Sequence, residues 1–213
     1  MSTLVVKGNA IGSGTITVEG PNTNSNFTVS IPAATTTLIG TDTTDVLTNK
    51  SIAATQLTGT IAAARLPAGS VLQVVQGVTT TQAVSTSTTW SASNLTVSIT
   101  PTNASSKIAV FVSGGMNGFA GGGASDENMG LKIYRKIGSG SFAEVESSSR
   151  GQQAIYVSAN IYSGLSINYL DSPSTTSTVT YTLYFRRENG SGTASVNRDS
   201  NNQTQIITME IAG

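Results

Sequence analysis

Hydrophobic residues in the second part of the chain alternate with polar ones over short runs, and this pattern limits the fold more than any other feature. Residues 179–185 read VTYTLYF, which places Val179, Tyr181, Leu183 and Phe185 on one side of an extended strand. Residues 95–99, 108–112 and 207–211 alternate in the same way. Because no stretch here keeps a helical period, the pattern predicts strands.

The neighbouring segments complete a set of about eight strands with turn signals between them. Residues 71–77 and 154–169 are typical of strands, and residues 128–147 hold two apolar runs around Gly138-Ser139-Gly140-Ser141, which predicts a hairpin. We therefore expect an all-β fold, with an antiparallel, jelly-roll-like β-sandwich over residues 70–213. The remaining 1–69 form a separate segment.

Residues 1–69 contain short strand-like pieces broken by Gly and Pro, with few large side chains. One chain cannot bury enough apolar area there to offset an ordering cost of about 1–2 kcal/mol per residue. Either this part is disordered or partner chains cover it, and its Thr and Val content favours partners. We expect an extended β/coil segment in which copies of the chain meet around a symmetry axis. The trimer-axis candidates are Leu47, Ile52, Leu57, Ile61 and Leu66.

The composition excludes several kinds of chemistry. The chain has no His and no Cys, so a Ser-His-Asp triad, a thiolate nucleophile and a cysteine-held metal cannot form. Its 11 basic and 11 acidic residues leave no positive surplus for nucleic acid. The N-terminus lacks a signal-peptide core, and no run is long enough to span a membrane. We expect a non-enzymatic protein made in the cytoplasm, without cofactor or metal.

Two passages carry a resemblance to a known family. FTVSIPAATTTLIGTDTTDVLTNKSI followed by QLTGTIAAARLPAGSVLQVV resembles the connecting and shaft segments of tail fibres and related virion proteins of tailed bacteriophages. TVTYTLYFRRENGSGTASVNRDSNNQTQIITMEIAG is similar to the closing strands of the β-domain in such fibres. The resemblance implies a homotrimer located in the virion, attached through its N-terminal part to another virion protein.

The short shaft favours a short tail fibre or spike that recognises the host surface. The alternative is a capsid decoration protein or head fibre. A carbohydrate-degrading enzyme is a distant third, because its carboxylate pair would have to be Glu144 with Glu146, or Asp126 with Glu127. The spacing of Glu144 and Glu146 is that of a solvated strand face.

Two segments supply candidate receptor contacts, with a host-surface glycan as the expected ligand. The glycine-rich segment 114–130 is predicted to be either a solvent loop or a binding loop, and the polar segment 195–205 either a turn or a carbohydrate contact. The candidates are Phe119, Asp126, Glu127, Arg198 and Asn201. The tyrosines Tyr156, Tyr162, Tyr169, Tyr181 and Tyr184 are predicted to lie in the core or in a trimer interface.

Overall fold

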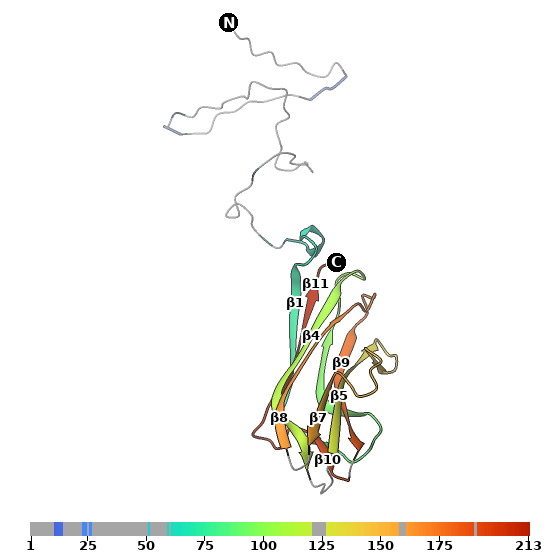
Figure 1. Ribbon diagram of the computed structural model, residues 1–213. Helices are drawn as coiled ribbons and strands as arrows, with labels where there is room; N and C mark the ends of the chain where they lie inside the picture. Colours follow the sequence, from blue (N-terminus) through green and yellow to red (C-terminus); the bar gives the residue numbers. More distant parts are fainter. Residues whose placement is uncertain are drawn as a thin grey trace. The chain divides into compact units, whose positions relative to one another are not determined.

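The protein is described by a computed structural model that covers residues 11–14, 23–24, 26, 51, 59, 61–120, 127–157, 161–189 and 191–213. The chain divides into two units, Met1–Leu57 and Thr58–Gly213, and the strands lie in the second (Figure 1). The predicted axis residues Leu47, Ile52 and Leu57 lie outside the described residues. The predicted division at residue 70 stays a prediction.

The described part of the second unit begins with a single 3₁₀ turn and continues in strands. The elements are η2 (Ala63–Arg65), β1 (Val71–Thr79), β2 (Ala83–Ser85), β3 (Ser91–Ile99), β4 (Lys107–Ala120), β5 (Glu127–Ile137), β6 (Ala143–Glu144), β7 (Gln153–Val157), β8 (Ile161–Asp171), β9 (Val179–Asn189), β10 (Thr193–Val196) and β11 (Thr204–Ile211).

The strands form two antiparallel sheets. In sheet A the order is β1-β11-β4-β8; in addition, β10 pairs with the C-terminal part of β4, and β2 pairs with β10. In sheet B the order is β3-β9-β5-β7, and β6 also pairs with β5. Among the eight main strands the first pairs with the last, the second with the seventh, the third with the sixth and the fourth with the fifth. This is the pairing of a long antiparallel ribbon rolled into a jelly roll. The predicted fold class is confirmed.

The core lies between the sheets and consists of the inward positions of the alternating runs. Val179, Tyr181, Leu183 and Phe185 are all buried, as predicted from their spacing. Leu131 and Ile133 of β5 meet them from the neighbouring strand, and Val110 and Val112 of β4 cover them from sheet A. The alternation therefore decided which side of each strand faces the core.

The glycine-rich segment differs from its prediction as a loop. Strand β4 runs on through Ala120, and only residues 121–126 of the segment lie outside the described residues before β5 begins at Glu127. Gly114 and Gly115, with φ of +95° and +66°, make an irregularity in the pairing with β8. At Gly118 a Cβ atom would lie 1.9 Å from the carbonyl oxygen of Ile161. These glycines therefore allow a bulge and a close strand contact.

Candidate functional site

Four aromatic side chains form a continuous row on the outer face of sheet B. Trp90 lies 6.5 Å from Tyr134, measured between ring centroids, and Tyr134 stacks on Tyr184 at 4.0 Å with an interplanar angle of 21°. Phe142 follows at 5.9 Å from Tyr184. All four side chains are half-buried, so the row keeps ring surface in contact with solvent. We call Trp90, Tyr134, Tyr184 and Phe142 the aromatic row.

Strand register brings the row together. Lys132 of β5 lies opposite Tyr184 of β9, so that Tyr134 is the diagonal neighbour of Tyr184 on the same face. Trp90 comes from the residue just before β3, and Phe142 from the turn between β5 and β6. The space for Trp90 depends on Gly130, because a Cβ atom there would lie 3.0 Å from the indole ring.

Cationic side chains accompany the aromatic row at both ends. The Lys132 Nζ atom lies 5.0 Å from the centre of the Trp90 ring, and the Arg186 guanidinium carbon lies 4.5 Å from it. Lys136 Nζ lies 5.0 Å from the centre of the Phe142 ring. Such cation–π contacts hold the charged groups beside the ring faces.

The segment that follows β6 covers part of this face and holds the cations in place. Lys132, almost fully buried, donates to Glu144 at 2.8 Å and to the carbonyl oxygen of Ser148 at 2.6 Å. Arg186 donates to Glu188 at 2.7 Å and to the carbonyl oxygen of Ser149 at 2.6 Å. Lys132 and Arg186 are thus already neutralised by carboxylates.

The Tyr134 hydroxyl group of the row remains protonated. Burial raises the pKa of Tyr134 above its ordinary value, and the nearby Glu144 carboxylate and Tyr184 raise it further. At neutral pH the Tyr134 hydroxyl can therefore donate as well as accept a hydrogen bond. The row thus offers ring faces beside neutral donors and acceptors.

The rest of the same face is a ladder of hydroxyl groups. Thr182 of β9 donates to Thr96 of β3 at 3.0 Å. Two further hydroxyl pairs continue the ladder toward the end of β3 and the start of β9. These pairs are Ser98 with Thr180 at 2.9 Å and Thr100 with Thr178 at 2.8 Å. On the outer face of sheet B the hydroxyl groups of β3 and β9 therefore lie beside the aromatic and basic side chains of β5, with Thr182 opposite Tyr134 and Thr180 opposite Lys136.

Sequence reasoning missed the aromatic row. It predicted Tyr184 for the core or a trimer interface. Tyr184 lies on the outer face of sheet B and not in the core, and of the tyrosine side chains that the structure describes, Tyr181 alone is fully buried. The signal was present in the outward positions of two runs, since Tyr184 and Arg186 alternate with core residues in β9, and Lys132, Tyr134 and Lys136 do so in β5. What the pattern could not show was that these strands are neighbours.

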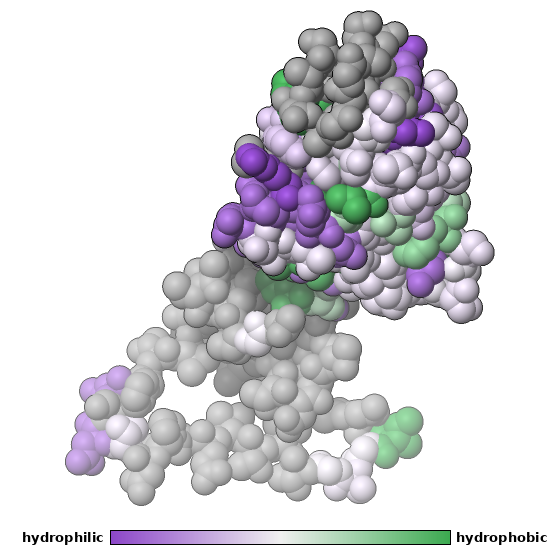
Figure 2. Space-filling view, turned by 90° about the horizontal axis from the view of Figure 1, so that it is seen from below, coloured by the Kyte–Doolittle hydropathy of each residue, from purple (hydrophilic) through white to green (hydrophobic). Residues whose placement is uncertain are grey.

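Of the predicted receptor contacts, Phe119, Glu127, Arg198 and Asn201 belong to elements at a different place, the end of the sandwich opposite the C-terminus (Figure 1). Phe119 lies near the end of β4, paired with Ile161 and Ala194, and Glu127 begins β5; the side chains of both, and all of Asp126, lie outside what the structure describes. Figure 2 shows this end with mostly polar described surface and small, separate hydrophobic patches.

Arg198 and Asn201 lie at this end, in the turn between β10 and β11. Arg198 is exposed and its guanidinium carbon lies 5.1 Å from the centre of the Tyr162 ring, on the β8 residue opposite Gly118. The backbone N–H of Asn201 donates to the Asp199 carboxylate at 2.9 Å, so the segment is a polar turn. Whether these residues contact a receptor stays a prediction.

Asp171 is engaged in the interior. Its carboxylate accepts two hydrogen bonds from Arg135 and one from the Tyr181 hydroxyl at 2.7 Å. Burial, and then the hydrogen bond to Asp171, raise the pKa of Tyr181 far above its ordinary value. This group therefore links sheet A to sheet B and is unavailable to Arg198.

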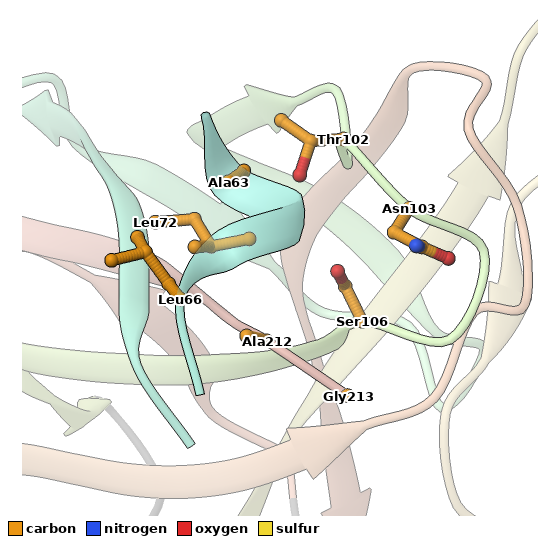
Figure 3. A pocket seen from close by; sticks show the side chains of 8 residues that line it. All are labelled: Ala63, Leu66, Leu72, Thr102, Asn103, Ser106, Ala212 and Gly213. Carbon is orange, nitrogen blue, oxygen red and sulfur yellow. The ribbon is translucent and has the colours of Figure 1, made fainter. Parts of the chain in front are cut away.

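A cavity of about 220 Å³ lies at the end of the sandwich where β1 begins and β11 ends (Figure 3). Its walls are Ala63, Leu66, Leu72, Thr102, Asn103, Ser106, Ala212 and Gly213. Of the predicted axis residues, Leu66 lines this cavity while Ile61 is 50% exposed. Their role at a trimer axis stays a prediction.

Beside this cavity the buried Glu210 ties three elements together. Its carboxylate accepts hydrogen bonds from Gln73 at 2.6 Å and from the backbone N–H and hydroxyl of Thr102 at 2.7 and 2.8 Å. Burial raises the pKa of Glu210, but these donors outweigh it and hold the pKa below its ordinary value. The carboxylate is thus a structural anion.

Of the carboxylates considered for catalysis, Glu144 and Glu146 are hydrogen-bonded within the fold. Glu144 pairs with Lys132, and Glu146 accepts from the backbone N–H and hydroxyl of Ser148. Within the described ranges, no three His, Cys, Asp or Glu side chains lie together as metal ligands would. In that same part of the chain, no helix has the length and apolar character needed to cross a membrane.

No protein-family model matches the chain, and no curated protein matches it. Among solved structures, the fold is similar to a chain in the structure of infectious bursal disease virus, Gx strain, with 12% identity and a TM-score of 0.32. The similarity covers 73% of this chain and 42% of that one. The function therefore has to be argued from the surface of the domain itself.

Proposed function

We propose that the protein is a structural component of a tailed-phage virion, a homotrimeric short tail fibre or spike whose β-domain recognises a glycan on the host surface. The segment 1–69 attaches to another virion protein and forms the shaft. The family resemblance of the N-terminal and closing segments supports the virion role. The jelly roll occurs in viral capsid proteins and in lectins alike, so the fold suits both the location and the ligand.

The observation that carries the recognition role is the aromatic row on the outer face of sheet B. Sugar rings present C–H groups that pack on aromatic faces, while their hydroxyl groups need donors and acceptors at the rim. Trp90, Tyr134, Tyr184 and Phe142 supply ring surface, and the Tyr134 hydroxyl and Lys136 supply polar contacts. Three copies in one trimer would present the site three times and raise a weak affinity by avidity.

Attachment assays with the purified full chain test this role. The wild-type protein is expected to bind host cells and to compete with intact particles for adsorption. Tyr184→Ser removes the centre of the aromatic row from an outward position, so we expect the concentration needed for competition to rise about tenfold or more, equivalent to roughly 1.4 kcal/mol. If this variant competes at the same concentration as the wild-type protein, the proposal is contradicted.

A control on the same face separates recognition from folding. Thr180→Ala removes a hydroxyl from the ladder end of β9 but leaves the aromatic row intact, and it should compete as the wild type does. Imaging of intact particles tests the location independently. Density at the tail or its collar supports the fibre, whereas density on capsid faces or vertices indicates a decoration protein.

A further inference from the structure

The two outer faces of the sandwich differ sharply in their exposed hydrophobic residues. From Val71 onward, every large hydrophobic side chain identified as exposed in the described part of the chain lies on a strand of sheet A, and none lies on sheet B. These residues are Val71, Val74, Val78, Val84, Phe111, Ile161 and Leu170. Sheet A therefore presents apolar surface to water that a single chain does not cover.

The register assembles these side chains into rows across sheet A. From β1 through β11 and β4 to β8, the rows are Val74, Met209, Ala109 and Leu170; then Gln76, Ile207, Phe111 and Asn168; then Val78, Gln205, Ser113 and Ser166. The residues between them, such as Thr208 and Val110, are fully buried. The rows thus face outward, and we call them the sheet A face.

The sheet A face contains no charged side chain. The nearest outward-facing charge on the paired strands is Lys107, in the adjacent row opposite Ile211, whereas Glu210 and Asp171 face the core. Sheet B, by contrast, carries Lys132, Lys136, Arg186 and Glu188 beside or within the aromatic row. A face without charge meets no like-charge repulsion when it packs against a second copy, and the polar residues in its outer rows can form hydrogen bonds between copies.

The size of the sheet A face suits an interface between subunits. Four strands at about 4.8 Å spacing and three rows that take up about six residues at about 3.4 Å rise give roughly 400 Å² in projection, before side-chain relief is counted. A standard interface buries about 800 Å² per partner. The area of the sheet A face together with its margins is therefore of the same order as the area that one partner buries in such an interface. It is also larger than the area of scattered single apolar residues.

The chain enters the domain alongside the edge of sheet A. Gly69 donates its N–H to the carbonyl oxygen of Ala212, and Ala212 donates to that of Ser70, so the chain enters directly alongside β11. The exposed Ile61 precedes this entry by only a few residues. An association of copies through 1–69 would thus continue naturally into sheet A.

We infer that the sheet A face is the subunit interface of the homotrimer, with sheet A turned toward the threefold axis and sheet B turned outward. This inference rests on the homotrimer of the proposed function and adds which surface is buried. It accounts for the uncharged face of one sheet and the charged, aromatic face of the other. It also leaves the aromatic row free on the outside of the assembly.

Thiol accessibility in the full-length chain tests the inference, because the natural sequence contains no cysteine. Leu170→Cys and Val74→Cys place single thiols at positions that are 55% and 56% exposed in one chain. Asn94→Cys and Ser98→Cys place them at exposed positions on β3 of sheet B. Labelling with a maleimide is followed by mass spectrometry, and light scattering gives the molar mass of each variant.

In a trimer that buries the sheet A face, the thiols at 170 and 74 should react at least about tenfold more slowly than those at 94 and 98. Equal labelling rates in a trimeric protein would overturn the interface while leaving the homotrimer standing. A wild-type protein with the molar mass of one chain would overturn both. Trimeric Leu170→Cys with slow labelling supports both.

Discussion

The contact between β4 and β8 at Gly118 gives a sharp test of the sandwich. In Gly118→Ala the new methyl carbon would start 1.9 Å from the Ile161 carbonyl oxygen and 2.9 Å from the Tyr162 Cα atom, and it must reach at least 3.0 Å. Both obstacles are backbone atoms in a paired strand, so neither can rotate away. The strands must therefore separate locally.

The expected loss follows from two contributions. Overpacking of a tight site costs about 1–3 kcal/mol, and a weakened ladder hydrogen bond between β4 and β8 adds about 1 kcal/mol. A total of roughly 2–4 kcal/mol corresponds to a fall of about 1–2 M in the urea midpoint for a domain with a slope near 2 kcal/mol/M. Urea unfolding at one fixed protein concentration measures it, since oligomers shift apparent stability by mass action.

Gly164→Ala is the matched control. Gly164 lies in β8, the strand that pairs with β4, but a Cβ atom there has no neighbour within 4 Å and its φ is ordinary. The substitution should change the unfolding free energy by no more than about 0.5 kcal/mol, or stabilise slightly through the unfolded state. If Gly118→Ala and Gly164→Ala unfold at the same urea concentration, the close contact between β4 and β8 is wrong.

Two further predictions concern buried charges. Because hydrogen bonds hold the pKa of Glu210 below its ordinary 4.5 in the folded state, its carboxylate stabilises the fold above about pH 4.5, and this contribution disappears as the pH falls through the lowered pKa. Glu210→Gln should therefore be less stable at pH 7 and lose less stability on going to pH 3, as measured by urea unfolding at both pH values; an unchanged pH dependence would refute this. Lys132→Met removes the anchor of the segment containing Glu144 and Ser148, so trypsin should cleave after Arg150 several-fold faster while the strand signal in circular dichroism stays unchanged. Equal cleavage rates would show that other contacts hold the segment.

The fold was predictable because its information is local and repeated. Each main strand alternates core and surface residues, and the inward positions of β9, from Val179 to Phe185, are all buried. The jelly roll follows from strand number and antiparallel turns, although the sequence could not decide which strands pair. The continuation of β4 beyond Gly114 was not predictable, because a glycine run is typical of a loop until β8 and β10 are placed beside it.

The aromatic row could not be predicted either, because the sequence does not show which strands are neighbours. Trp90 and Tyr134 are far apart in the sequence, and their rings meet only because β3 and β5 both pair with β9. Of the two interpretations of segment 195–205, the polar turn is observed, with Arg198 exposed, since such turns have a local signature. A site built across three strands has no such signature. It can be recognised only once the register is known.

The distribution of the few charges links the two proposals. A chain with 10% charged residues has little freedom to spread them evenly, and these strands place them beside the aromatic row while the sheet A face has none. If the domain worked as a monomer, Val74, Phe111 and Leu170 would remain in water and invite aggregation. Covering them with copies removes that hazard and leaves sheet B as the surface proposed to meet the host. The location of the charges is thus itself an argument that the two sheets have different partners.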